Sequence, residues 1–164
     1  RRFGFFKIFN NQKDLKNYFS KSGPEAISNK FNYKYFKKKL INKEKNIKNI
    51  LLDQNYISGI GNIYANEILF YCKINPLNKG KKIVKNQIIR LIKNSKLVLN
   101  LAIKLGGSSI KDFKNTSGIS GLFQNEFKVY GRENKNCTRK NCKGKICKIF
   151  ISNRSTFFCN LCQK

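Results

Sequence analysis

Two close pairs of cysteines near the C-terminus constrain this 164-residue chain more than any other feature of its sequence. Cys137 and Cys142 form a C-x4-C pair, and Cys159 and Cys162 form a C-x2-C pair further along the chain. Four thiolates in two close pairs are the ligand set that a tetrahedral Zn²⁺ site requires. The sequence therefore predicts one structural zinc ion held by these four cysteines.

The segment between the two pairs predicts a β-hairpin. Ile149, Ile151 and Phe157 alternate with polar residues on either side of a turn at residues 152–155. A module of about 30 residues cannot bury enough apolar surface to fold alone, so the metal would supply the folding energy. Cys147 remains open as an alternative ligand in place of one member of the first cysteine pair.

The charge balance favours a polyanionic partner. Lys and Arg number 35 against 8 Asp and Glu, which gives a formal net charge of +27. The chain has no histidine, so a Ser-His-Asp triad, a histidine general base and a Cys₂His₂ metal site are excluded. Nucleic acid is favoured over an anionic membrane, because no basic amphipathic segment stands alone and no apolar run could span a bilayer. We therefore expect a soluble, cytoplasmic protein.

Apolar periodicity predicts a mainly α-helical region before the cysteine module. The predicted helices cover residues 13–20, 30–42, 44–53, 62–75 and 84–105. Pro76 should end the fourth helix, Cys72 should be a small buried residue on it, and Gly106 and Gly107 should stop the fifth. Residues 1–9 predict a strand. Because the chain contains no Met, we expect it to be processed or to be a piece of a longer protein.

The tight turn before the fourth predicted helix is a candidate phosphate site. Gly59 and Gly61 allow backbone amides to approach an anion, and the helix N-terminus favours negative charge there. Asn62 can cap the helix and also donate to a phosphate oxygen. Three lysines, Lys43, Lys45 and Lys48, lie on or directly before the preceding predicted helix. A plain tight turn between two helices is the alternative.

Several segments along the chain follow one family pattern in the same order. Residues 51–77 read LLDQNYISGIGNIYANEILFYCKINPL. RRFG at 1–4, GPEAI at 23–27, GGSSIKDF at 106–113, GLFQNEFKVYGR at 121–132 and NRSTFFC at 153–159 accompany it. These segments resemble the bacterial formamidopyrimidine-DNA glycosylase family, and residues 51–77 are similar to its helix-two-turns-helix signature. The related endonuclease VIII group shares the fold but resembles these segments less.

The resemblance implies a mainly α fold in three parts. Residues 1–20 would be the last strand of an N-terminal β-sandwich domain and a linker, residues 21–131 a helix-two-turns-helix DNA-binding domain, and residues 132–164 a zinc-finger β-hairpin. The implied function is base-excision repair of oxidised purines, with strand cleavage by β,δ-elimination. The implied partner is double-stranded DNA with an oxidised purine or an abasic site, without a membrane, and the implied state is a monomer.

The resemblance also implies roles for individual residues. Arg154, near the hairpin tip, matches the finger arginine that enters the minor groove and takes part in the final elimination step. Arg1 matches the arginine that faces the orphaned base, and Phe3 the aromatic wedge that fills the vacated stack. The implied DNA contacts are Arg1, Arg2, Phe3, Lys43, Lys48, Gly61 and Asn62. The implied lesion loop includes Ser117, Gly118, Gly121, Phe123 and Tyr130.

Departures from the family pattern bear on catalysis. The family's N-terminal proline nucleophile, the glutamate after it and a lysine of its N-terminal domain do not occur in this chain. No lysine shows a buried or charge-crowded setting that would lower its pKa. Ile119 and Ser120 stand where the family often has Lys-Pro, and the first cysteine pair is wider than the usual C-x2-C. We therefore expect DNA binding with little glycosylase activity, and a noncatalytic zinc-ribbon nucleic-acid protein is the alternative.

Overall fold

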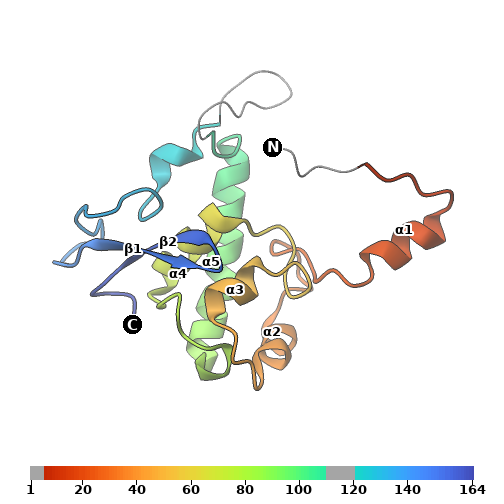
Figure 1. Cartoon of the computed structure of the whole chain (residues 1–164), viewed down its shortest axis with the longest axis horizontal. Helices are drawn as coiled ribbons and strands as arrows, with labels where there is room; N and C mark the ends of the chain where they lie inside the picture. The colour runs from red at the N-terminus through yellow and green to blue at the C-terminus, as the bar shows by residue number, and fades with distance from the viewer. Residues whose placement is uncertain (1–5, 110–120) are drawn as a thin grey trace.

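The computed structural model describes residues 6–109 and 121–164 as a helical body with a β-hairpin at its side (Figure 1). Its elements are α1 (Gln12–Phe19), α2 (Tyr33–Leu40), α3 (Ile47–Leu52), α4 (Asn62–Cys72), η1 (Gly80–Lys82), α5 (Lys85–Lys104), η2 (Phe123–Glu126), β1 (Ile146–Ile151) and β2 (Arg154–Cys159). The short 3₁₀ helices η1 and η2 were not predicted from the sequence. The prediction of a mainly α fold followed by a two-stranded hairpin is confirmed.

Asparagines start three of the helices. The side chains of Asn11, Asn32 and Asn46 each accept a hydrogen bond of 2.8 to 3.0 Å from the amide of the third helical residue. Such a cap satisfies an amide that has no partner within the first turn. Because Asn46 caps α3, the prediction of a helix from residue 44 is wrong at its start. Lys43 and Lys45 therefore precede α3.

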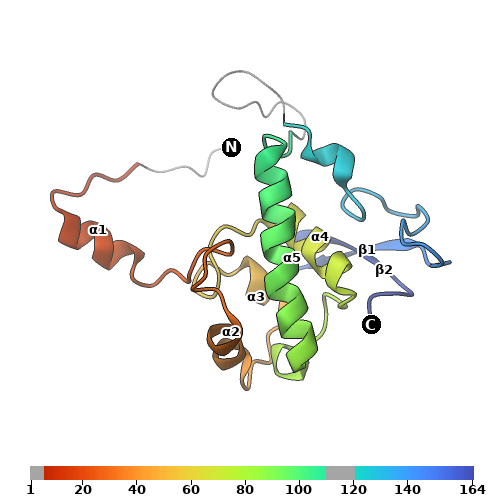
Figure 2. The ribbon, with the colours of Figure 1, turned by 180° about the vertical axis from the view of Figure 1, so that it is seen from behind.

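The core of the molecule lies around α4 and α5. α5 runs behind the other helices in Figure 1 and in front of them in Figure 2. α4 packs against α5, α3 and β2, and every residue from Ala65 to Phe70 is buried. This enclosure explains why most residues of α4 are apolar, whereas α5 buries one stripe and exposes the rest. Cys72, at the end of α4, is fully buried, as predicted.

Left-handed backbone conformations follow the ends of both core helices. α4 ends after Cys72 because Lys73 takes a φ of 55°. Pro76 lies beyond this point, so the prediction that Pro76 ends the helix is wrong. Gly106 and Gly107 follow α5 with φ values of 71° and 84°, and the predicted glycine stop is confirmed.

β1 and β2 pair antiparallel across a two-residue turn. Ile151 pairs with Arg154, and the turn residues Ser152 and Asn153 have φ values of 48° and 58°. Two successive left-handed residues match the right-handed twist of the strands, which is why such turns join hairpins. Arg154 is therefore the first residue of β2 rather than a turn residue, and it is exposed.

The hairpin has an apolar cluster of its own. Phe70 of α4 and Val129 pack with Ile146 and Phe157 of the hairpin, and this cluster is separate from the main core. Phe70 thus joins the hairpin to α4. The division of the chain at residue 131 stays a prediction, since Val129 lies before it in sequence and packs with the hairpin.

The predicted N-terminal strand can be compared from residue 6 onward. Residues 6–9 form no strand, because a strand needs a paired neighbour for its backbone groups and no described strand pairs with them. α1 follows, buries none of its residues and stands apart from α4 and α5 (Figure 1). Within residues 6–109 and 121–164, no helix is both long and apolar enough to cross a bilayer.

Candidate functional site

The four cysteines predicted to bind zinc lie together. Their sulfur atoms are all within 4.8 Å of one another. The Sγ atoms of Cys137 and Cys162 are 3.9 Å apart, and those of Cys142 and Cys159 are 3.7 Å apart. A disulfide bond is about 2.05 Å long, so these cysteines are not joined in pairs. Cys147 is not part of the cluster, which removes it as the alternative ligand.

The spacing of the sulfur atoms fits tetrahedral coordination of zinc. A Zn–S bond of about 2.3 Å places the sulfur atoms of a tetrahedron about 3.8 Å apart, close to the two separations given above. Burial raises the pKa of the Cys137 thiol to about 12, and a bound cation would offset this by stabilising the thiolate. Buried Gln163 ties the cluster to the helical body, because it accepts from the Cys159 amide and donates to the Ile74 carbonyl, both at 2.9 Å.

Lys48 fastens the hairpin to α3. Its ammonium donates to the Ser155 carbonyl oxygen (3.1 Å) and to the Thr156 hydroxyl oxygen (2.7 Å), and 0% of the residue is exposed. Burial, together with the positive charge of Arg154, lowers the pKa of Lys48 from 10.5 to about 8. The expectation that no lysine has a lowered pKa is therefore wrong. The ammonium also faces the hairpin rather than the surface, so it is not placed as expected for a direct phosphate contact.

Two asparagines of α4 also hold β2. Asn62 donates to the Ser155 carbonyl (3.1 Å), and Asn66 accepts from the Phe157 amide (2.7 Å). The N-cap residue of α4 is Gly61, which provides no side-chain bond, so the prediction that Asn62 caps the helix is wrong. Gly61 is exposed, and no described atom lies within 4 Å of the position that a Cβ would take there. A side chain at Gly61 would therefore meet open space beside the N-terminus of α4.

Arg154 lies at a shallow groove between the hairpin turn and α3. The groove is lined by Lys45, Asn49, Leu52, Asp53, Ser152 and Arg154. Asn49 donates to the Ser152 hydroxyl (2.8 Å), and Lys45 forms an ion pair with Asp53 (2.7 Å). The Asn49–Ser152 bond fixes the turn against α3 while Arg154 stays exposed. The structure thus brings the predicted Arg154 and Asn62 to one junction of α3, α4 and β2.

A comparison with known families identifies the family of the helices that form this junction. Residues 22–114 match the model of the family described as formamidopyrimidine-DNA glycosylase H2TH domain, which is more than half of the chain and includes α2 to α5. The chain belongs to the formamidopyrimidine-DNA glycosylase family. The resemblance seen in its sequence motifs is confirmed, and the match to formamidopyrimidine-DNA glycosylase favours this family over the zinc-ribbon alternative.

Relatives and solved structures of formamidopyrimidine-DNA glycosylases match along nearly the whole chain. The chain is 43% identical over 164 residues to the Haemophilus influenzae formamidopyrimidine-DNA glycosylase, covering 100% of this chain and 59% of that protein. The Lactococcus lactis Fpg complex with abasic-site DNA superposes with a TM-score of 0.86 at 37% identity, covering 93% of this chain and 56% of that one. A mutant of that Fpg with Fapy-dG DNA gives 0.84 at 38%, with the same coverage. The chain therefore spans about 60% of the length of such relatives.

The base of the lesion loop expected for this family is closed. The Gly121 amide donates to the Ser109 hydroxyl (2.8 Å), and the Phe123 amide to the Gly107 carbonyl (3.0 Å). A Cβ at Gly121 would collide with the backbone of Gly106 and Gly107, so this approach requires glycine. Phe123 is buried in the main core, so it is not placed to contact a lesion, contrary to the expectation.

Two other residues of the predicted site, Tyr130 and Lys43, lie within the described parts of the chain. Tyr130 packs between Phe127 and Phe157, with ring centroids 5.5 and 5.1 Å away. Lys43 lies before α3, beside the ring of Tyr56. The remaining predicted residues, Arg1, Arg2, Phe3, Ser117 and Gly118, lie outside the described residues.

Sequence reasoning missed a buried carboxylate that anchors the segment around Tyr130. Glu67 of α4 accepts the backbone amides of Lys128 (2.9 Å), Val129 (3.1 Å) and Tyr130 (2.9 Å). Burial raises the pKa of Glu67, and these amide bonds act in the opposite direction. The available signal was an acidic residue inside the apolar run of α4, in a chain with only 8 acidic residues.

Proposed function

We propose that this chain is the DNA-binding part of a base-excision repair enzyme. The observation that carries the proposal is the match, along the whole chain, to a protein named formamidopyrimidine-DNA glycosylase. Similar solved structures hold DNA with an abasic site or with Fapy-dG. The whole protein would remove oxidised purines such as 8-oxoguanine and formamidopyrimidines and cut the strand by β,δ-elimination. The partner of this chain would be duplex DNA that contains such a base or an abasic site.

The junction of α3, α4 and β2 would grip the DNA. The space beside Gly61, the N-cap residue of α4, is open, and a helix N-terminus favours a phosphate. Asn62 adjoins this point, and Arg154 extends from the start of β2 with its guanidinium free to enter the minor groove. Lys48 would act indirectly, because it holds the strand that carries Arg154. α3, the turns after it and α4 would form the helix-two-turns-helix motif.

The residues outside the described parts would complete the contact with the damaged site. By family resemblance, Arg1 would face the orphaned base, Phe3 would fill the vacated stack and Arg2 would support nearby phosphate contacts. Ser117 and Gly118 would belong to the loop that covers the flipped base. Gly121, at the closed base of that loop, would set where the loop leaves the core.

The residues of this chain would bind DNA without forming the covalent intermediate. The family's chemistry uses an amine nucleophile. Among the described lysines, the one with a lowered pKa is Lys48, which is buried beneath β2, where no sugar carbon can reach it. Incubation with an 8-oxoguanine duplex and borohydride tests this. We expect a band shift for the bound duplex but no covalent product, and efficient covalent trapping would contradict the proposal.

The four-cysteine cluster would hold one structural Zn²⁺. Cys137, Cys142, Cys159 and Cys162 would be its ligands, which the sulfur separations support. When bound, the ion would supply no reaction chemistry and would serve only to fix the fold. The residues around it would hold the base of the hairpin through Gln163, while Lys48, Asn62 and Asn66 hold its other end.

A further inference from the structure

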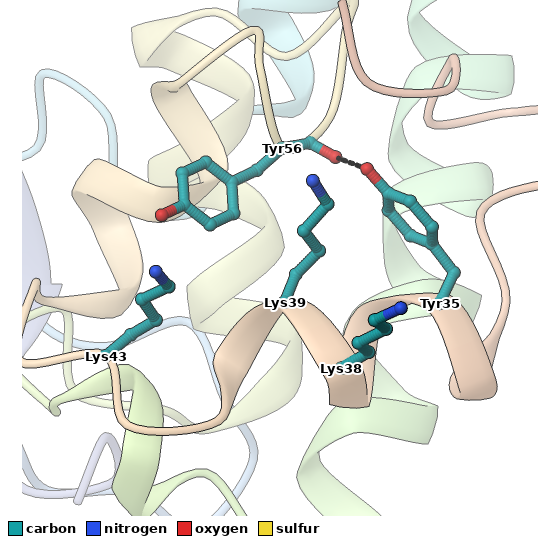
Figure 3. A pocket seen from close by; sticks show the side chains of 5 residues that line it. All are labelled: Tyr35, Lys38, Lys39, Lys43 and Tyr56. Atoms are coloured by element: carbon teal, nitrogen blue, oxygen red, sulfur yellow. Dashed lines mark hydrogen bonds between the residues drawn. The ribbon is translucent and has the colours of Figure 1, made fainter.

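A pocket lined by lysines and tyrosines adjoins the groove that contains Arg154. α2 contributes Tyr35, Lys38 and Lys39, and the segments on either side of α3 contribute Lys43 and Tyr56 (Figure 3). Its volume of about 370 Å³ is within the range of ligand sites. Figure 3 shows Lys39 rising between the two rings, with Lys43 beneath Tyr56 and Lys38 beside Tyr35.

The walls of the pocket are fixed by contacts between α2 and the turn after α3. The Tyr35 hydroxyl donates to the Tyr56 carbonyl oxygen at 2.9 Å. The amide of Tyr35 in turn donates to the cap residue Asn32 at 3.0 Å, so the start of α2 sets the position of this ring. Gly23 packs directly against the Tyr56 backbone, where a Cβ would collide. The two tyrosines therefore form a preformed frame on which the lysines are arranged.

The lysines of the pocket lack counter-ions among the described residues. The Nζ atom of Lys39 lies 5.6 Å from the Tyr35 ring and 5.7 Å from the Tyr56 ring, and that of Lys43 lies 5.9 Å from the Tyr56 ring. The ion pairs in residues 6–109 and 121–164 involve other lysines, Lys45, Lys81, Lys128 and Lys148. Cation–π contacts hold the ammonium groups in place but do not neutralise them. Like charges around one hollow repel one another, and a bound anion would relieve this repulsion.

Lys45 lies between the pocket and the groove of Arg154. The Nζ atom of Lys45 lies 5.9 Å from the ring of Tyr56, which is a wall of the pocket. Lys45 also lines the groove together with Arg154. The ion pair with Asp53 partly offsets the charge of Lys45. Lys39 and Lys43 form no ion pair with any described residue. The result is a basic strip from the hairpin turn to α2, and an extended strip suits a chain of phosphates better than a single small anion.

We propose that this pocket binds backbone phosphates of the duplex at a distance from the damaged site. Lys38 and Lys39 of α2 would each contact a phosphate on the arm of the duplex that leaves the Arg154 groove past Tyr56. α2 would thereby lengthen the DNA-binding surface beyond the junction of α3, α4 and β2. This inference rests on the proposed function, because it takes the same duplex to lie across Arg154.

Salt-dependent binding of two duplexes by the full chain tests the proposal. Both contain the same central abasic site, but one has long arms and the other is trimmed to a few base pairs around the site. The variant Lys38→Gln/Lys39→Gln is compared with Lys93→Gln/Lys104→Gln, which removes the same charge from exposed positions of α5, the helix behind α3 in Figure 1. On the long duplex, we expect the pocket variant to reduce the slope of log affinity against log salt by about 2, or about 0.9 for each lost phosphate contact.

The trimmed duplex and a small anion separate the remaining outcomes. We expect the pocket variant and the α5 variant to bind the trimmed duplex equally, since it would not reach α2. Equal slopes for both variants on the long duplex would overturn the proposal. Pyrophosphate binding that is lost in the pocket variant while its long-duplex slope stays unchanged would also overturn it, because the pocket would then hold a small free anion.

A failure of the proposed function gives a different pattern. In that case the wild-type chain would bind abasic and intact duplexes equally, whatever the state of the pocket. The slope difference between the two double variants can still be measured on the intact long duplex. Circular dichroism of all variants checks that they are folded, which is expected because Lys38, Lys93 and Lys104 are exposed and Lys39 is partly exposed.

Discussion

Replacing Lys48 with Met tests how the hairpin is fastened to α3. Met keeps most of the apolar stem but lacks the ammonium that donates to Ser155 and Thr156. A hydrogen bond from a charged donor contributes about 1.5 to 3 kcal/mol. The free-energy cost of burying the Lys48 ammonium opposes the stabilisation from these two hydrogen bonds. The pKa shift from 10.5 to about 8 corresponds to about 3 kcal/mol of that cost. We therefore expect a loss of only about 1 to 2 kcal/mol of unfolding free energy at pH 7.

The pH dependence of the Lys48→Met effect is its sharper readout. Between pH 8 and 10.5 the folded chain has released the Lys48 proton and the unfolded chain still holds it, so the wild-type free energy of unfolding rises with pH. Water at the exposed hairpin turn screens part of this effect. We expect wild type to gain about 1 to 3 kcal/mol relative to the variant between pH 7 and 10.5.

Urea unfolding followed by circular dichroism measures this difference. Lys104→Met is the matched control, because it removes an exposed ammonium of α5 and should show no gain over the same pH range. A difference between wild type and Lys48→Met that stays constant from pH 7 to 10.5 would refute the burial of the Lys48 ammonium against β2.

Three further substitutions test separate parts of the molecule. Cys159→Ser should reduce bound zinc from about one equivalent to near zero by atomic absorption, and retention of one equivalent would contradict the ligand set. Glu67→Gln turns an amide donor toward the backbone amides of residues 128–130 and should lower the unfolding free energy at pH 7 by about 2 kcal/mol; unchanged urea unfolding would contradict these bonds. Gly121→Ala should lower the melting temperature, because its Cβ meets the Gly107 carbonyl, whereas Gly61→Ala meets no described atom; equal melting temperatures would count against the closed loop base.

The features predicted correctly from the sequence depend on local signals. The cysteine pairs, the alternation in the hairpin and the glycine stop after α5 are set by residues close together in the chain. Local signals also explain the small errors at helix ends. An asparagine cap moved the start of α3, and a left-handed Lys73 ended α4 before Pro76.

The features missed by the sequence depend on contacts between distant residues. Lys48 faces a carbonyl 107 positions away, so its sequence context, a lysine beside Asn49 in a chain rich in lysine, gives no sign of burial. Glu67 likewise finds its three amide donors more than 60 positions further on. Phe123 belongs to the core because the loop base closes on Gly107, a contact that no periodicity reveals. Of the candidate site, Arg154 could be selected because it lies next to the hairpin turn, but the residues that hold β2 in place could not.

The preference for damaged DNA tests the central claim most directly. Fluorescence anisotropy measures how wild type and Arg154→Ala bind an abasic duplex and the same duplex without the abasic site. The control variant is Arg90→Ala, which changes an exposed residue of α5. We predict that wild type and Arg90→Ala prefer the abasic duplex and that Arg154→Ala loses about tenfold of this preference, within the 1 to 3 kcal/mol of a specific contact. A wild-type chain that binds both duplexes equally, or an Arg154→Ala variant that keeps the full preference, would contradict the account.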